Sequence, residues 1–147
     1  MLYLAADHGG FELKNHLKQF LEARGYQIED LGPHTLEPLD DYPDYAFEAA
    51  KKITSDQDKA ILVCRTGQGM AIAANRYAHI RAAVALSEEI VHRSREDENT
   101  NVIVMAADYT DQELAQRIAL AFIEGPFTGQ ERHRRRIGKI SRVGVKP

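Results

Sequence analysis

Several kinds of residue and pattern are scarce in this chain of 147 residues, and each scarcity excludes a class of protein. The single cysteine rules out a disulfide within the chain and favours a reducing compartment, so we expect a cytoplasmic protein. No apolar run approaches the roughly 18 residues of a membrane-spanning helix. The chain begins with an expected strand, so we expect no signal peptide. A net charge of −3 leaves no overall field that favours nucleic acid or a membrane surface as a partner.

The order of the expected elements predicts the fold class. A length of 147 residues suits one domain, residues 1–147, around one core. Short apolar runs alternate with amphipathic segments of helical length, which is typical of βαβ units and a parallel sheet. We expect strands at about 2–6, 26–31, 59–63, 81–86 and 101–106. We expect helices at about 10–24, 43–54, 69–78, from 87 onward, at 111–124 and at 130–140. The prediction is an α/β fold with helices on both faces of the sheet.

The segment 64–71 carries the strongest functional signal. Cys64 follows a buried strand, and Gly67 and Gly69 open the next helix. Ligands of parallel α/β sheets bind at the carboxyl ends of the strands, where this cysteine lies. The helix N-terminus and the adjacent Arg65 predict a lowered thiol pKa, and the glycine loop offers N–H donors to an oxyanion. A cysteine in this position is also often a small apolar residue, so both interpretations stay open here.

Asp7 and His8 follow the first expected strand and should reach the same edge of the sheet as Cys64. Asp7 also fits as a cap of the first helix, and His8 as an ordinary turn residue. Two strand ends that carry Asp-His and Cys-x-Thr-Gly-x-Gly nevertheless favour a binding or catalytic site.

Basic residues gather at 132–136, in the last expected helix. Arg132 and Arg136 are four residues apart, so they share a helix face and could hold a phosphate together with His8. Such a phosphate site requires the last helix to fold over the carboxyl edge of the sheet. The other interpretation is that these arginines form a solvent-exposed face of the helix. The six histidines show no metal-ligand spacing, and residues 40–41 and 96–98 are interpreted as solvated acidic clusters. We therefore expect no metal and no other cofactor.

Several short motifs also occur in a characteristic order along nearly the whole chain. They are Asp7-His8-Gly9-Gly10-Phe11-x-Leu13-Lys14, Asp41-Tyr42-Pro43, Cys64-x-Thr66-Gly67-x-Gly69, Ile72-Ala73-Ala74-Asn75, Ile80-Arg81-Ala82, Asn99-Thr100-Asn101-Val102 and Arg132-His133-x-x-Arg136. Together they resemble the ribose-5-phosphate isomerase B and galactose-6-phosphate isomerase family.

The resemblance implies a three-layer, Rossmann-like α/β/α sandwich with strand order 2-1-3-5-4, whereas the pattern alone favours a simpler order for the last two strands. It implies a homodimer, or a dimer of dimers, with active sites shared between subunits. It also implies metal-independent interconversion of small aldose and ketose phosphates, of the ribose-5-phosphate and ribulose-5-phosphate type, through a cis-enediolate. The basic segment 127–147 would pack at the active site or at the dimer interface.

The resemblance further implies roles for individual residues. Cys64 would be the base that moves a proton between C1 and C2, and Thr66 would hydrogen-bond near the reacting carbons. The N–H groups of the loop would hold the enediolate oxygen, and the loop residues are Gly67, Gln68 and Gly69. The substrate-binding residues would be Asp7 at the sugar hydroxyls, His8, Arg132 and Arg136 at the phosphate, and Asn99.

The chain departs from the family's pattern in three places. Asp97 and Glu98 stand where the family has a His-Asn pair, whose histidine helps to open the sugar ring. Asp108 stands near an expected phosphate-binding arginine, and Arg65 replaces a glycine. Asp97 is thus the candidate at the ring-opening position. One alternative is another sugar, such as an open-chain tetrulose phosphate, and a second is a catalytically silent paralogue that binds sugar phosphates.

Overall fold

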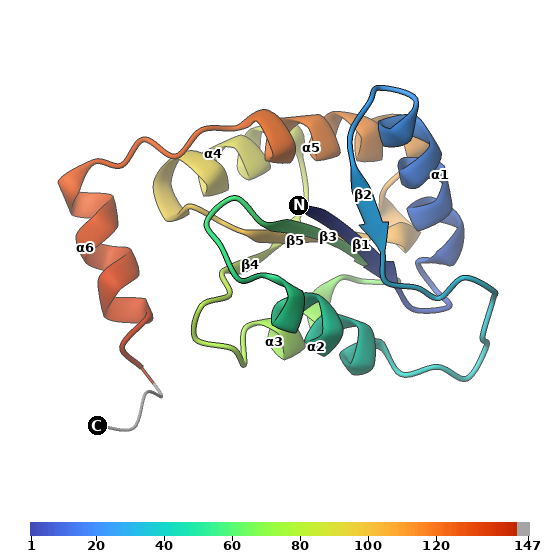
Figure 1. Cartoon of the computed structure of the whole chain (residues 1–147). Helices are drawn as coiled ribbons and strands as arrows, with labels where there is room; N and C mark the ends of the chain where they lie inside the picture. Colours follow the sequence, from blue (N-terminus) through green and yellow to red (C-terminus); the bar gives the residue numbers. More distant parts are fainter. Residues whose placement is uncertain (144–147) are drawn as a thin grey trace.

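A parallel sheet of five strands forms the centre of the computed structural model, which describes residues 1–143 (Figure 1). The strands are β1 Leu2–Ala6, β2 Ile28–Asp30, β3 Lys59–Cys64, β4 Ala82–Ala85 and β5 Val102–Ala106. Their order is β2-β1-β3-β5-β4, and every neighbouring pair is parallel. The order implied by the resemblance is therefore confirmed, and the simpler order for the last two strands is wrong.

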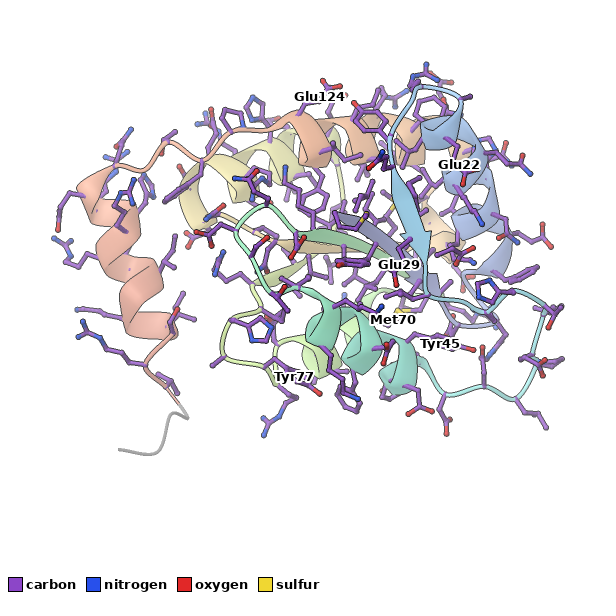
Figure 2. The ribbon with its side chains drawn as sticks, viewed as in Figure 1. Glu22, Glu29, Tyr45, Met70, Tyr77 and Glu124 are labelled. Atoms are coloured by element: carbon purple, nitrogen blue, oxygen red, sulfur yellow. The ribbon has the colours of Figure 1, made fainter. Side chains whose placement is uncertain are left out.

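Helices cover both faces of this sheet and make the predicted sandwich. One face carries α1 Phe11–Glu22, α4 Glu88–Glu98 and α5 Gln112–Glu124, and the other carries α2 Tyr42–Lys52 and α3 Gln68–Ala74 (Figure 1). A 3-10 turn, Ala107–Tyr109, precedes α5. Figure 2 shows Tyr45 and Met70 on the α2 and α3 side, and Glu22 and Glu124 on the opposite side.

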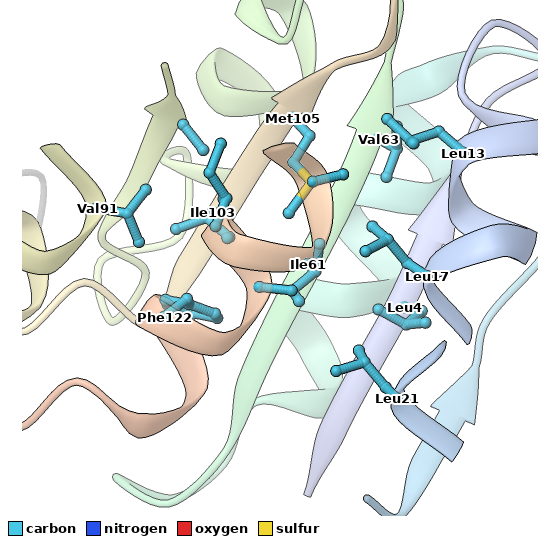
Figure 3. Packing of buried hydrophobic residues seen from close by; sticks show 14 of the residues in the cluster. Leu4, Leu13, Leu17, Leu21, Ile61, Val63, Val91, Ile103, Met105 and Phe122 are labelled. Carbon is cyan, nitrogen blue, oxygen red and sulfur yellow. The ribbon is translucent and has the colours of Figure 1, made fainter. Parts of the chain in front are cut away.

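The three central strands β1, β3 and β5 are almost entirely apolar because helices bury both of their faces. Leu4, Ile61 and Ile103 pack toward α1, α4 and α5 (Figure 3), whereas Leu62 and Val104 pack toward α2 and α3. All five side chains are fully buried. Each such burial contributes roughly 1.5–3 kcal/mol. The packed interior thus holds the carboxyl ends of β1, β3 and β5 next to one another.

Helix α1 joins this core through an apolar face and one buried charge. The buried leucines are those that the periodicity predicts, namely Leu13, Leu17 and Leu21. Lys14, the last residue of the first motif, is also fully buried, which the apolar periodicity does not predict. Its Nζ lies 2.6 Å from Asp30 Oδ1 and donates to the carbonyl oxygen of Pro33 at 2.9 Å. This amine ties α1 to the end of β2 and to the loop that follows it.

Helix α3 ends at Ala74, before the expected boundary near residue 78. The side chain of Asn75 donates to the carbonyl oxygen of Ala82 at 2.9 Å and accepts from its N–H at 2.8 Å. Because this amide pairs with the edge of β4, the chain turns there rather than continuing as a helix. The expected second strand is likewise shorter, and its ordered part is Ile28–Asp30.

One helix cap agrees with the sequence and another differs. Ser87 Oγ accepts from the N–H of Ile90 at 3.2 Å and begins α4, as predicted. Asp7 was expected to cap the first helix, but its Oδ1 accepts from the N–H of Gly10, one residue before α1 begins. Asp7 therefore closes the turn between β1 and α1 instead of capping the helix itself.

The basic helix α6, Glu131–Ile140, lies beside the end of α4 and apart from the loop that follows β2 (Figure 1). Thr128 anchors its approach, because its Oγ1 and N–H both contact the carbonyl oxygen of Glu96, at 2.8 and 3.2 Å. The last four residues of the predicted segment 127–147 lie outside the described residues. Within residues 1–143, no helix has the length and apolarity needed to cross a bilayer.

Candidate active site

The loop after β3 surrounds the sulfur of Cys64 with backbone N–H groups. Cys64 is the last residue of β3, and its side chain is buried. Gly67 has a φ of 77°, a left-handed conformation that glycine adopts without strain, and its N–H donates to Cys64 Sγ at 3.2 Å. Helix α3 begins at the next residue. In this arrangement the N–H expected to hold an enediolate oxygen contacts the thiol instead.

The environment of Cys64 corrects the predicted lowering of its pKa. Burial raises the pKa of the thiol above its ordinary value. The N–H groups of Gly67, Met70 and Thr66 favour the thiolate, but they do not cancel the burial and the nearby charge of Asp7, which raises the pKa further. The sequence argument failed because the depth of the sulfur cannot be read from its position after a strand.

Asp7 lies beside Cys64 because β1 and β3 are neighbours in register, with Ala6 opposite Val63. Asp7 as a residue is only 5% exposed, and burial raises the pKa of its carboxyl group above the ordinary value. A Cβ on Gly10 would overlap the backbone carbonyl of Val63. This glycine therefore lets the turn after β1 pass close to β3 and brings Asp7 to the cysteine.

His8 is held by a carboxylate that the sequence argument did not assign to the site. Asp40 Oδ1 accepts from the backbone N–H of His8 at 3.0 Å and lies 2.7 Å from His8 Nδ1. The hydrogen bond with Asp40 raises the pKa of His8 above its ordinary value. Residues 40–41 were interpreted as a solvated acidic cluster, which is wrong for Asp40, because its side chain is only 9% exposed. No local pattern links residues 32 positions apart.

The remaining loop residues lie at the surface of the same edge. Thr66 and Gln68 are exposed, and Gly69 faces the ring of Tyr42. A Cβ on Gly69 would come within 2.5 to 2.8 Å of ring and hydroxyl atoms of Tyr42. The sequence argument did not assign Tyr42 to the site, and the structure places its phenol against the start of α3.

Arg65 and Asp108 form an ion pair at this edge. Arg65 Nε donates to Asp108 Oδ2 at 3.0 Å, and the N–H of Asp108 donates to the carbonyl oxygen of Arg65 at 3.0 Å. The arginine stem lies against Gly9, where a Cβ would overlap Arg65 Cγ. Arg65 and Asp108, which both depart from the family's pattern, are therefore in direct contact.

The other predicted site residues lie at the opposite edge of the same chain. Asp97 and Asn99 stand at the end of α4, where the chain returns to the amino end of β5. Asp97 Oδ1 lies 3.5 Å from His133 Nε2, which also accepts from Arg132 Nε at 3.0 Å. Arg136 is exposed on the same helix, α6. Within one chain, α6 thus does not fold over the edge that carries Cys64.

The structure therefore brings together two groups of residues rather than one. The first group is at the carboxyl edge of the sheet and comprises Asp7, His8, Cys64, Thr66, Gly67, Gln68 and Gly69. The second group is at the amino edge and on α6, and comprises Asp97, Asn99, Arg132 and Arg136. Among residues 1–143, no cluster of three or more His, Cys, Asp or Glu side chains is suited to a metal ion.

Comparison with known proteins finds solved structures that resemble nearly the whole chain. A ribose 5-phosphate isomerase from Thermotoga maritima matches with a TM-score of 0.91 and 42% identity, over 97% of each chain. A ribose-5-phosphate isomerase B from Mycoplasma genitalium, solved with bound ribulose-5-phosphate, matches with a TM-score of 0.90 and 35% identity. That match covers 96% of this chain and 93% of the other. Ribose-5-phosphate isomerase B of Escherichia coli is 36% identical over 138 residues, 93% of this chain and 91% of that protein.

The parallel sheet, its strand order and these likenesses define the class as a Rossmann-like sugar isomerase. A family profile described as Ribose/Galactose Isomerase matches residues 2–140. The chain belongs to this family, as its motifs indicated.

Proposed function

We propose that this protein interconverts the aldose and ketose forms of a small sugar phosphate, of the ribose-5-phosphate and ribulose-5-phosphate type, with Cys64 as the base. The observation that carries the proposal is the cysteine itself. Cys64 is the last residue of β3. Its sulfur accepts a hydrogen bond from the N–H of Gly67 and lies beside the buried carboxyl group of Asp7. The bound ribulose-5-phosphate of the Mycoplasma genitalium protein supports the substrate class.

The chemistry of the proposed reaction fits this arrangement. The thiolate of Cys64 removes the proton from C2 of the open-chain aldose, and the electrons form a cis-enediolate across C1 and C2. A proton passes from the oxygen on C2 to the oxygen on C1, and the thiol of Cys64 returns its proton to C1, which leaves the C2 carbonyl of the ketose. A thiolate of raised pKa is a stronger base, and a backbone nest favours charge on the atoms it surrounds. As the sulfur becomes a neutral thiol, the Gly67 N–H is released toward the oxygen that gains charge. The proposed reaction requires no metal and no cofactor.

The position of the second group supports a site shared between two copies of the chain. Arg132 and Arg136 carry the charge suited to a phosphate, yet α6 lies away from the edge that holds Cys64. A twofold homodimer can bring the amino edge of one copy to the carboxyl edge of the other, and does so twice. We place Arg132, Arg136, Asn99 and Asp97 of one subunit next to Cys64 and His8 of its partner.

Replacement of the base tests the proposed reaction. Cys64→Ala and Cys64→Ser should bind ribulose 5-phosphate as the wild type does but lose roughly 10²-fold or more in kcat, the scale of a lost general base. Serine keeps the size of the side chain but not an accessible anion. Interconversion of ribose 5-phosphate and ribulose 5-phosphate is the measurement. Near wild-type turnover by either variant would refute the role of Cys64, and a wild type that binds but never turns over would indicate a silent paralogue.

Asp97 favours a second candidate substrate, a four-carbon sugar phosphate that needs no ring opening. A histidine at neutral pH can donate and accept the protons that open a furanose, whereas an ordinary carboxylate is a poor acid there. Asp97 Oδ1 lies 3.5 Å from Nε2 of the buried His133, and that nitrogen already accepts from Arg132 Nε.

The second candidate is tested by comparing turnover of ribose 5-phosphate with that of an erythrose or erythrulose phosphate, in wild type and in Asp97→His. The four-carbon substrate should have the higher kcat/KM in wild type, and Asp97→His should improve only the ribose phosphate. Efficient ribose 5-phosphate turnover that is lost in Asp97→Asn would instead assign ring opening to Asp97.

A further inference from the structure

The ion pair between Arg65 and Asp108 leaves a guanidinium group available at the mouth of the candidate site. Asp108 Oδ2 contacts only Nε of Arg65, and no other side-chain hydrogen bond of this arginine occurs among residues 1–143. Both terminal amino groups are therefore open, and the side chain is 66% exposed. A guanidinium fork matches a phosphate oxygen pair in geometry and charge.

The position of the fork is set by two contacts. The carbon stem of Arg65 packs on Gly9, which leaves no room for a side chain there, and Asp108 holds the Nε end. Gly9 directly follows His8, so the arginine lies along the same turn as the imidazole that Asp40 orients. The two cations are close enough for the charge of Arg65 to oppose protonation of His8. Arg65 also directly follows Cys64, which keeps all three side chains at one edge of the sheet.

We infer that Arg65 is a specificity-determining residue that binds the phosphate of the substrate together with His8 of the same subunit. The inference rests on the proposed function of the site. It places a phosphate-binding cation at the tip of β3, with Asp108 as its positioning residue. The family's pattern instead has a glycine after the cysteine and an arginine near position 108. In this arrangement Arg65 and His8 of one subunit bind the phosphate together with the α6 arginines of the other subunit.

Two simpler roles for Arg65 make different predictions. As a surface ion pair it would affect neither ligand binding nor turnover. As a shield, it would only neutralise Asp108, whose carboxylate otherwise repels a phosphate. In that case, removing both charges together would restore binding. A pair of near-isosteric replacements, Arg65→Gln and Arg65→Gln with Asp108→Asn, separates these roles because both keep the stem that packs on Gly9.

The experiment measures the affinity of the full-length protein for inorganic phosphate by calorimetry, and kcat/KM for ribose 5-phosphate and for unphosphorylated ribose. Arg65→Gln should weaken phosphate binding by about 10-fold or more, the scale of a lost charge-assisted pair. It should raise KM for ribose 5-phosphate with little change for ribose, and the double variant should stay equally weak. Arg117→Ala is the matched control, since Arg117 is also an exposed arginine in an ion pair, with Glu113 at 2.8 Å. It should bind phosphate as the wild type does.

Unchanged phosphate affinity in Arg65→Gln overturns the inference, and so does recovery of affinity in the double variant. The two proposals fail separately. If no sugar phosphate is turned over but phosphate affinity still depends on Arg65, the proposed function fails and the anion site stands. If ribose 5-phosphate is turned over equally by wild type and Arg65→Gln, the function stands and the anion site fails.

Discussion

Cys64 experiences two opposed influences on its ionisation. Burial and the charge of Asp7 favour the neutral thiol, while the backbone N–H groups of the loop favour the thiolate. The raised pKa shows that the first influence is the stronger one in the free protein. A bound substrate would change both the burial of the sulfur and its hydrogen bonds with the loop, because it would displace water and contact the loop. In the free protein Cys64 is therefore favoured as the neutral thiol, and it must lose its proton before it can act as a base.

Asp7→Asn should lower the pKa of Cys64. The amide removes a negative charge near the sulfur but keeps an oxygen that can accept from the N–H of Gly10. The rate of alkylation by iodoacetamide follows the thiolate fraction, so its pH profile should move to lower pH in this variant. Asp56→Asn, an exposed carboxylate near the amino edge of the sheet, is the control and should leave the profile in place. A profile that Asp7→Asn does not move would mean that Asp7 exerts no field at the sulfur.

At the scale of elements, the site depends on how closely the turn before α1 approaches β3. An added Cβ on Gly10 would overlap the backbone carbonyl of Val63, and backbone atoms cannot rotate away as a side-chain end can. The neighbouring Gly9 is similarly close to Arg65, but only to its flexible stem. The glycine pair thus sets both the β1–β3 approach and the place of the arginine.

Gly10→Ala should destabilise the protein by roughly 1–3 kcal/mol, the usual cost of overpacking. Denaturant unfolding measures the change, and the same variant should also lose activity, because Asp7 moves with the turn. Gly138→Ala is the control: nothing lies within 4 Å of its added Cβ, in the middle of α6. An alanine there should be neutral or stabilise the helix by up to about 1 kcal/mol. Equal effects of the two substitutions would contradict the packing argument.

At the scale of the whole molecule, the two groups of candidate residues lie at opposite edges of one sheet. Crossover helices run back against the strands, so the end of α4 reaches the amino edge while Cys64 marks the carboxyl edge. The buried His133 places α6 against the end of α4, with its Nε2 3.5 Å from Asp97 Oδ1. A single chain therefore cannot bring Arg136 to Cys64 without moving α6, which is why we propose a site shared with a second copy.

Heterodimers should reveal this sharing. A dimer of one Cys64→Ala chain and one Arg136→Ala chain should contain one intact site and regain about half of the wild-type kcat/KM, although each variant alone is impaired. The reciprocal pairing is the control. A wild-type chain paired with a chain that carries both substitutions should contain no intact site. If each site used one chain only, the two pairings would give the opposite results. Two affinity tags allow each heterodimer to be purified before the assay.

Local patterns were sufficient for much of the fold and for one edge of the site. The alternation of apolar runs with amphipathic segments predicts the strands and helices, since burial in a two-sided sheet leaves a direct periodic signal. The position of Cys64 and Asp7 after strands predicts their shared edge, because parallel strands end on the same side. The order of the last two strands came from the resemblance, since the two orders differ only in long-range pairing.

The charge pairs of the site, the ionisation of Cys64 and the position of α6 depend on contacts between residues far apart in the chain. Asp40 meets His8 across 32 residues and Arg65 meets Asp108 across 43, and nothing in the neighbourhood of either residue signals its partner. The ionisation of Cys64 depends on how deeply the packed chain buries its sulfur, which no motif records. The place of α6 depends on a few contacts with α4 rather than on its own amphipathic pattern. By itself, the sequence determined which residues form the strands and which edge carries the cysteine, because those follow from local periodicity and chain direction. Only the tertiary structure decided which charges face each other, because that depends on the packing of elements far apart in the chain.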